Sequence, residues 1–219
     1  MTHGERLALF DQADLYVVIT EAHCAGRSAL EVLAKVLAAG VRLVQLREKE
    51  LTGRQLYERA LAFRRETAAA GALLLINDRL DIALAVEADG VHLGQDDLPI
   101  RAARRIAPDL LIGASTHSLE EALAAQEAGA SYVNLGPIFP TPTKEAATFL
   151  GPEMIDRIAP HLRIPWTTMG GIKASNIEQV VSRGARHPAV ITAVTAAPDP
   201  LAAARELRDL INRRRLPAP

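Results

Sequence analysis

The sequence has little cysteine, few aromatic residues and almost no net charge, and each shortage excludes a class of protein. Cys24 is the single cysteine among 219 residues, which excludes an intramolecular disulfide and a cysteine-based metal cage. The net charge of −1 gives no sign of a nucleic-acid partner or an acidic-membrane partner. No apolar run approaches the length that spans a membrane, and the charged first residues do not resemble a signal peptide. We therefore expect a reducing, cytoplasmic setting in which Cys24 is a small loop residue rather than a nucleophile.

What the sequence does have is a regular alternation of short apolar runs and longer helical patterns. Apolar residues make up 49% of the chain and aromatic residues only 4%, which predicts a core of aliphatic side chains. The expected strands cover residues 15–20, 43–46, 73–77, 90–93, 111–115, 132–135, 165–169 and 189–193. The expected helices cover residues 28–39, 52–70, 80–86, 99–106, 119–128, 152–159, 174–183 and 200–212.

Eight strands that alternate with eight helices predict a single α/β domain, a (β/α)₈ TIM barrel. We assign the whole chain, 1–219, to this domain, with the barrel over about 15–212, a short N-terminal extension and a frayed C-terminal tail. A doubly wound open sheet is the alternative. It is disfavoured because no glycine-rich dinucleotide fingerprint follows an early strand.

Several helix boundaries carry capping signals. Ser28 with Glu31, and Ser118 with Glu121, have the spacing of a capping box. A second set of residues follows Ala-rich or Arg-ended helices, where a left-handed C-cap is wanted: Gly40, Gly71, Gly129 and Gly184.

In a TIM barrel the chemistry lies at the C-terminal ends of the strands, and the unusual polar residues of this sequence fall there. At the end of the second expected strand, Gln45 and Arg47 share one face, and Arg47 with Lys49 forms a local positive site. A solvent-exposed charge cluster is the alternative interpretation. Gln45 argues against it, because an amide within an apolar run needs buried partners.

Carboxylates follow the third and fourth expected strands. Asp78 and Asp97 would lie on neighbouring parts of the rim, and two carboxylates beside a diphosphate are a usual Mg²⁺ site. Both also have a structural interpretation, because Asp78 could cap the helix expected from residue 80 and Asp97 the helix after it. Asp81 and Asp96 are alternative metal ligands.

The fifth expected strand ends in Ser115, a rim hydroxyl that could donate a hydrogen bond to a leaving oxygen. His117 could act as an acid or base, or could brace the rim. The surrounding sequence is not a nucleophile elbow, so Ser115 is not expected to form a covalent intermediate. His92, within the fourth expected strand, is interpreted as a packed and hydrogen-bonded barrel residue.

Two further segments suit phosphate groups. The proline-stiffened loop after the sixth expected strand carries three donors, Thr141, Thr143 and Lys144. A rigid surface loop with an incidental lysine is its alternative interpretation. Gly170-Gly171 and Thr192, after the seventh and in the eighth expected strand, lie where TIM barrels often bind phosphate.

Taken in order, these segments resemble the thiamine-phosphate synthase family from about residue 15 to residue 207. The resemblance is carried by residues 44–49, 76–79, 90–97, 113–117, 136–144 and 170–172. Members of that family join hydroxymethylpyrimidine diphosphate to thiazole phosphate, use Mg²⁺ and release pyrophosphate. The family's reaction is dissociative, with pyrophosphate leaving before the thiazole nitrogen attacks.

The resemblance implies a role for each matching position of this sequence. Gln45, Arg47, Lys49, Asn77, Ser115 and Lys144 would hold the pyrimidine diphosphate, and Ser115, Lys144 and Arg47 are the candidate catalytic residues. Asp78 and Asp97 would hold Mg²⁺. Thr141, Thr143, Gly171, Ile191 and Thr192 would hold the thiazole phosphate. The implied partners are these two small molecules, with no nucleic acid and no membrane; the oligomeric state, a homo-oligomer included, stays open.

Two stretches depart from the family pattern. In the seventh expected strand, Trp166, Thr167, Thr168 and Met169 are bulkier and more polar than expected. Residues 185–188 contain Arg186, His187 and Pro188 where the family usually has an acidic residue and a glycine, and Thr192 replaces a serine. The family's roles therefore transfer least directly at the thiazole phosphate site, and whether this stretch weakens thiazole phosphate binding stays open. Two other functions stay open: a thiazole tautomerase, with His117 as the acid or base, and a non-catalytic protein that binds a thiamine precursor.

Overall fold

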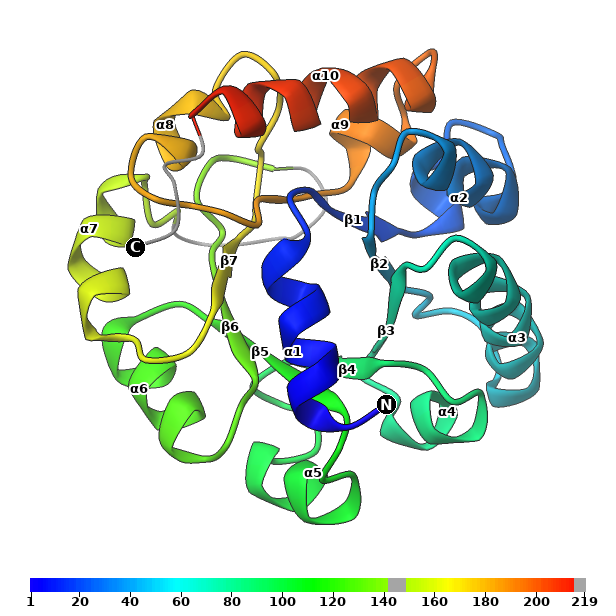
Figure 1. The fold of residues 1–219 in the computed structure, drawn as a ribbon, viewed down its shortest axis with the longest axis horizontal. Helices are drawn as coiled ribbons and strands as arrows, with labels where there is room; N and C mark the ends of the chain where they lie inside the picture. The colour runs from blue at the N-terminus through cyan, green and yellow to red at the C-terminus, as the bar shows by residue number, and fades with distance from the viewer. Residues whose placement is uncertain (142–148, 215–219) are drawn as a thin grey trace.

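The computed structural model describes residues 1–141 and 149–214, which form a barrel of parallel strands surrounded by helices (Figure 1). The strands are β1 (Tyr16–Ile19), β2 (Leu43–Leu46), β3 (Leu73–Asn77), β4 (Gly90–Leu93), β5 (Leu111–Thr116), β6 (Tyr132–Leu135), β7 (Trp166–Thr168) and β8 (Ala189–Val190). They form one sheet in the order β7-β6-β5-β4-β3-β2-β1-β8. An isolated parallel bridge between Thr168 and Pro188 joins its two ends. The expected TIM barrel is thereby confirmed, and an open doubly wound sheet is excluded.

The α-helices alternate with the strands and, apart from α1, cover the outside of the barrel (Figure 1). They are α1 (His3–Gln12), α2 (Ala29–Ala38), α3 (Gly53–Ala69), α4 (Leu80–Ala85), α5 (Ile100–Ile106), α6 (Leu119–Glu127), α7 (Glu153–Ile158), α8 (Glu178–Val181), α9 (Thr192–Thr195) and α10 (Pro200–Arg214). Short 3₁₀ helices cover Glu21–His23 and Ala159–His161. Within the described ranges, no helix combines the length and apolar character needed to cross a membrane.

Two predicted boundaries were wrong. The eighth strand was expected to extend to residue 193, but it ends at Val190, because Ile191 leaves the extended region (φ −117°, ψ −93°) and α9 begins at Thr192. The helix expected from residue 174 begins only at Glu178. A turn precedes it, in which the Lys173 N–H donates to the Asn176 side chain over 2.8 Å.

Alternate residues of each strand face the interior of the barrel or the surrounding helices. The interior-facing apolar side chains form one buried cluster, which includes Tyr16, Val18, Leu43, Leu75, Leu111 and Tyr132. Their sequence neighbours, such as Val17 and Val44, belong to a larger cluster between the strands and the helices. Nearer the C-terminal ends of the strands, the interior positions are polar. The apolar part of the barrel interior therefore stops just below the C-terminal ends of the strands.

Helix α1 was not expected, and it lies across the N-terminal end of the barrel (Figure 1). Its Phe10 is fully buried, with its ring centroid 4.7 Å from that of Tyr132 and 4.9 Å from that of His187. Thr2 and Glu5 form a complete capping box at its start, a signal that the sequence analysis left unused. The helix thus closes the floor of the barrel.

The helix-capping predictions were largely correct. Ser28 and Glu31 form a complete capping box, and the four expected C-cap glycines all have positive φ, between 65° and 93°. The second predicted box is only half formed. Ser118 accepts from the Glu121 N–H, but the Glu121 carboxylate turns instead to His117.

Gly113 lies where the Tyr132 ring fills the interior, and a Cβ at this position would overlap the ring atoms. We expect Gly113→Ala to lower the free energy of unfolding by about 2 kcal/mol, the usual cost of overpacking a filled core. Urea denaturation would measure it. Gly4→Ala is the matched control, because nothing lies within 4 Å of that Cβ and alanine favours a helix. Equal stability of the two variants would contradict this account.

Candidate active site at the barrel rim

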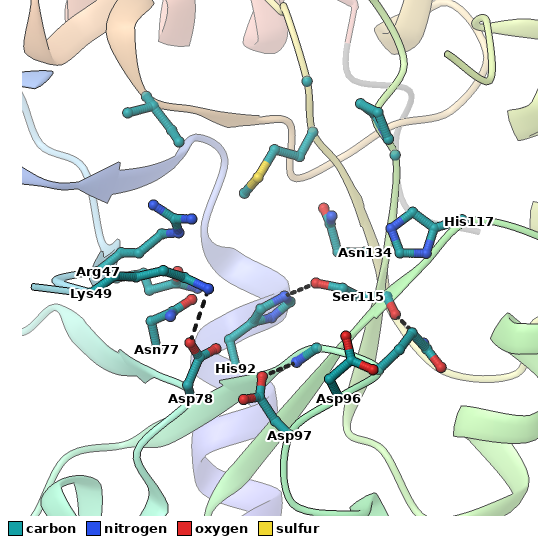
Figure 2. Close-up of a pocket in the computed structure, with 18 of the residues that line it drawn as sticks. Arg47, Lys49, Asn77, Asp78, His92, Asp96, Asp97, Ser115, His117 and Asn134 are labelled. Atoms are coloured by element: carbon teal, nitrogen blue, oxygen red, sulfur yellow. Dashed lines mark hydrogen bonds and ion pairs between the residues drawn. The ribbon is translucent and has the colours of Figure 1, made fainter. Parts of the chain in front are cut away.

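A cavity of about 310 Å³ opens at the C-terminal ends of the strands (Figure 2). Every described residue expected at the diphosphate and metal sites lines it: Gln45, Arg47, Lys49, Asn77, Asp78, Asp97 and Ser115. Lys144, which was assigned to the same site, lies outside the described residues. The topology thus brings together side chains from four different strands and the loops that follow them.

A second cavity of about 290 Å³ lies beside the first. Thr141, Gly171, Ile191 and Thr192, all expected at the thiazole phosphate, line it; Thr143 lies outside the described residues. The two cavities share four residues, Thr141, Met169, Gly170 and Ile191. Two ligands bound in them would therefore touch across a common boundary.

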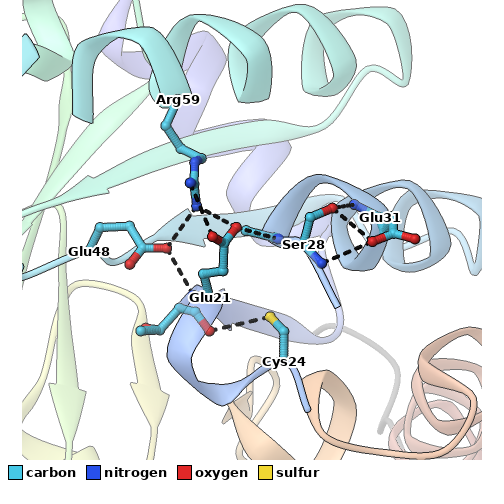
Figure 3. A network of polar contacts seen from close by, with 8 residues as sticks. Glu21, Cys24, Ser28, Glu31, Glu48 and Arg59 are labelled. Carbon is cyan, nitrogen blue, oxygen red and sulfur yellow. Dashed lines mark hydrogen bonds and ion pairs between the residues drawn. The ribbon is translucent and has the colours of Figure 1, made fainter. Parts of the chain in front are cut away.

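Arg47 and Lys49 form the positive side of the first cavity (Figure 2). The residue between them, Glu48, turns away, and its side chain is only 8% exposed against the loop after β1 (Figure 3). Its carboxylate accepts from the Glu21 N–H over 2.8 Å and lies 3.5 Å from Arg59. Burial raises the pKa of Glu48 despite these partners. Glu48 therefore anchors the segment from which both cations extend.

Asp78 and Asp97 lie close to each other in the first cavity, and Lys49 lies next to Asp78 (Figure 2). Lys49 Nζ lies 3.4 Å from the Asp78 carboxylate, and Asp97 accepts from the Gly94 N–H over 2.7 Å. Burial and then the neighbouring Asp97 carboxyl raise the pKa of Asp78. Asp78 also has a positive φ of 61°, uncommon for a residue other than glycine. The backbone thus holds two mutually repelling carboxyls together.

The capping interpretations of these two aspartates were wrong. The N-cap of α4 is Arg79 and that of α5 is Pro99, and neither helix start receives a side-chain cap. Asp81, the first alternative ligand, forms an exposed ion pair with Arg79 over 2.6 Å and does not line the cavity. Asp96, the second alternative, does line it.

A divalent cation fits the Asp78 and Asp97 pair. Their oxygens are the ligands that Mg²⁺ prefers, and a cation between them would relieve the repulsion that raises the pKa of Asp78. No group of three or more His, Cys, Asp or Glu side chains suited to a metal occurs in residues 1–141 and 149–214. The remaining ligands would therefore come from a bound diphosphate and from water, as is usual for Mg²⁺.

Below the rim, a chain of buried polar side chains crosses the barrel interior. Gln45 Nε2 donates to the Tyr16 hydroxyl, which lies 3.1 Å from the Tyr132 hydroxyl. His92 joins Tyr132 to Ser115, with Nδ1 2.8 Å from the Tyr132 oxygen and Nε2 2.9 Å from Ser115 Oγ. The prediction that His92 is packed and hydrogen-bonded is confirmed, since its side chain is 4% exposed. It also lines the cavity, a role the sequence analysis did not assign.

Asn134 is another cavity residue that the sequence analysis missed. Thr167 of β7 donates to its side-chain oxygen over 2.7 Å, and both residues are buried. The signal was present, because Asn134 is a polar residue within an apolar strand, as Gln45 is. The polar character of β7 is thereby explained: Thr167 orients an amide of the neighbouring strand.

His117 lines the first cavity and is held by Glu121. The Glu121 carboxylate accepts from the His117 N–H over 2.8 Å and lies 2.9 Å from the ring Nδ1. This bracing explains why Glu121 does not complete the capping box of α6.

In the second cavity, the glycine pair serves the packing of the chain itself. A Cβ on Gly170 or Gly171 would overlap the loop after β6, whose Phe139 N–H donates to the Gly170 carbonyl over 3.0 Å. Lys173, not assigned by sequence, supplies a positive charge to this cavity. The loop after β6 and the loop after β7 therefore pack directly against each other beside the boundary between the two cavities.

The departure from the family pattern lies at the other end of β8. The His187 ring packs against Phe10 in a tilted arrangement, with Nδ1 3.0 Å from the Ala13 carbonyl, and the Pro188 carbonyl accepts from the Tyr16 N–H. His187 and Pro188 therefore belong to the floor formed with α1. Of the departing positions Arg186, His187, Pro188 and Thr192, only Thr192 lines the second cavity.

Comparisons with known proteins agree with one another. The family model described as thiamine monophosphate synthase matches residues 15–194. The chain is 42% identical to a thiamine-phosphate synthase of Pelotomaculum thermopropionicum, covering 93% of this chain and 94% of that protein. It is 49% identical to one of Chlorobium luteolum, covering 84% and 88%. The solved structure of a thiamine phosphate pyrophosphorylase from Pyrococcus furiosus superposes with a TM-score of 0.88 at 38% identity, covering 94% of this chain and 98% of that one.

The Asp78 carboxyl should affect stability with a definite sign. Its folded-state pKa is raised above 3.8, so the folded protein binds this proton more tightly, and stability falls as the pH rises through the raised pKa. We expect Asp78→Asn to remove this fall. At neutral pH and without metal, the variant should gain about 0.5 kcal/mol, the size typical of partly exposed charge interactions.

Asp81→Asn is the control for that measurement. Its pKa is lowered by Arg79, so Asp81 stabilises the fold above its ordinary pKa and this contribution is lost as the pH falls. Unfolding followed at several pH values should therefore show opposite signs for the two variants. A lower stability of Asp78→Asn at neutral pH would contradict the repulsion between the two aspartates.

Proposed function

The chain belongs to the thiamine-phosphate synthase family of transferases, and we propose that its two rim cavities bind hydroxymethylpyrimidine diphosphate and thiazole phosphate. The carrying observation is the shared boundary between the cavities, because a reaction that joins two substrates requires their reacting atoms to meet. The family is supported by a model match over residues 15–194 and by relatives that cover nearly the whole chain.

The first cavity suits the pyrimidine diphosphate. Arg47 and Lys49 supply positive charge for the diphosphate, and Lys144 is assigned there by the family pattern. The Gln45, Asn77 and Asn134 amides supply directional donors and acceptors for a heterocyclic ring. The departing pyrophosphate carries negative charge, so fixed cations stabilise the transition state more than the bound substrate.

Asp78 and Asp97 would hold the Mg²⁺ ion, which neutralises diphosphate charge when bound. Their own contribution is positional. Asp97 is fixed by the Gly94 N–H, and Asp78 by its backbone conformation, so that neither must reorganise on binding.

The second cavity suits the thiazole phosphate. Lys173 and Thr192 offer a charge and a hydroxyl at one part of it, and Thr141 lies at the boundary with the first cavity. If Lys173 and Thr192 held the phosphate group, the thiazole ring would point toward the boundary with the first cavity. After pyrophosphate departs, the ring nitrogen would attack the pyrimidine cation, and no covalent enzyme nucleophile is needed.

The cytoplasmic setting, the single-domain organisation of 1–219 and the absence of nucleic-acid or membrane partners stay predictions. They are supported by the near-neutral charge and single cysteine of the sequence.

The decisive experiment is pyrophosphate release from hydroxymethylpyrimidine diphosphate, with and without Mg²⁺ and thiazole phosphate. We expect release that requires Mg²⁺, with thiamine phosphate formed in equal amount. Asp97→Asn should lower kcat at least about 100-fold, because it removes a metal ligand while its amide oxygen can still accept from Gly94. Isomerisation of a thiazole phosphate without pyrophosphate release would favour the tautomerase instead, and near-normal turnover of Asp97→Asn would refute the metal site.

The anchoring role of Glu48 gives a separate prediction. Glu48→Ala should raise the KM for the pyrimidine diphosphate about tenfold and should also lower kcat, because Arg47 and Lys49 lose the fixed segment from which they contact the substrate and the departing pyrophosphate. Glu48→Gln should retain a low KM, since its amide oxygen still accepts from the Glu21 N–H. Glu127→Ala, which breaks an exposed ion pair with Arg163, is the control. An unchanged KM in Glu48→Ala would exclude this role.

A further inference from the structure

The polar chain inside the barrel begins and ends at the cavity. Gln45 and Ser115 both line the cavity, whereas Tyr16 and Tyr132, between them, are fully buried. Figure 2 shows the last link, in which His92 points at Ser115. If these hydrogen bonds served only to stabilise the barrel, the first and last residues would not both need to line the cavity.

Tyr16 and Tyr132, the two tyrosines among these buried polar side chains, each have one hydroxyl proton to donate. Burial raises the pKa of both hydroxyls well above the ordinary value, so both stay protonated. Tyr16 accepts from Gln45, and a fully buried hydroxyl proton needs an acceptor, which the Tyr132 oxygen provides at 3.1 Å. Tyr132 must then donate its own proton to the next member, His92 Nδ1, at 2.8 Å.

From this order of donors we propose that Tyr16, Tyr132 and His92 are positioning residues that fix the direction of the Ser115 hydroxyl. His92 is held as the neutral tautomer with its proton on Nε2, and this N–H donates to Ser115 Oγ over 2.9 Å. Ser115 therefore accepts from within the barrel and keeps its own proton for a ligand in the cavity.

The opposite direction would have the opposite consequence. If Ser115 donated to His92, its proton would point into the barrel, and the hydroxyl could only accept from a ligand. The diphosphate oxygens of the proposed substrate are acceptors, so only the proposed direction lets Ser115 stabilise the departing pyrophosphate. This consequence rests on the proposed function, whereas the tautomer of His92 does not.

The tautomer is tested by ¹⁵N NMR of histidine-labelled protein, with the His92 signals assigned by their loss in His92→Gln. The expected result is a neutral ring with its proton on Nε2, and a shift toward a mixed population in Tyr132→Phe, which has no proton to give to Nδ1. A wild-type ring with its proton on Nδ1 would overturn the inference, whatever the protein's activity.

Kinetics test the route through Ser115. Tyr132→Phe and His92→Leu should each lower kcat for pyrophosphate release about tenfold with a smaller change in KM. His92→Gln should recover much of the loss, because its amide N–H can donate to Ser115. Tyr132→Phe added to Ser115→Ala should cause no further loss, since its effect passes through the serine.

His187→Gln is the matched control, a buried histidine on the barrel floor outside this chain. It should leave kcat unchanged. If Tyr132→Phe fails to fold, Tyr16→Phe tests the same chain one link earlier. Full activity in both tyrosine variants, or additive losses in the double variant, would overturn the inference; a wild-type protein without pyrophosphate release would instead refute the proposed function and leave the NMR result standing.

Discussion

The Tyr132 side chain is the point on which the barrel floor and the rim both depend. Its ring packs on Phe10 below, occupies the space that Gly113 leaves, and lies in an edge arrangement with Tyr16 at 6.3 Å between centroids. Its hydroxyl links Tyr16 to His92. An apolar residue here would fill the same volume, but it would leave two buried partners without a hydrogen bond, at about 1–3 kcal/mol each.

The charged groups at the rim differ from these interior groups, because they are not fully paired with one another and are placed to interact with a ligand. Asp78 and Asp97 raise the energy of the unliganded protein, and Lys49 offsets this only in part, through an ion pair in which its own side chain is 54% exposed. A metal diphosphate would neutralise both the carboxylates and the cations. Tyr16, Tyr132 and His92 find hydrogen-bond partners within the barrel without a ligand, and they therefore provide a fixed support for the rim.

Much of this arrangement follows from the sequence, and the rest required contacts that a sequence does not contain. The eight strands, the C-cap glycines and the gathering of Gln45, Asp78, Asp97 and Ser115 at one rim follow from periodicity and from the geometry of a parallel barrel. Helix α1 was missed although Thr2 and Glu5 signalled its start. The end of β8 at Val190 could not be predicted, since an apolar run of that length continues equally well as a strand.

The least predictable feature is the direction of the interior chain, because two of its members, Tyr16 and Tyr132, are aromatic residues of apolar strands. Gln45 was expected to need a partner, but the partner, Tyr16, is an aromatic residue of an apolar strand and carries no polar signal in a hydropathy pattern. The register between β1 and β2 decides the pairing, because it sets Val18 against Gln45 and leaves Tyr16 one interior layer lower. Nε2 of Gln45 then reaches down to the Tyr16 hydroxyl inside the barrel. In this protein the strand register fixes which buried groups meet, and the order of their donors fixes which proton the rim presents.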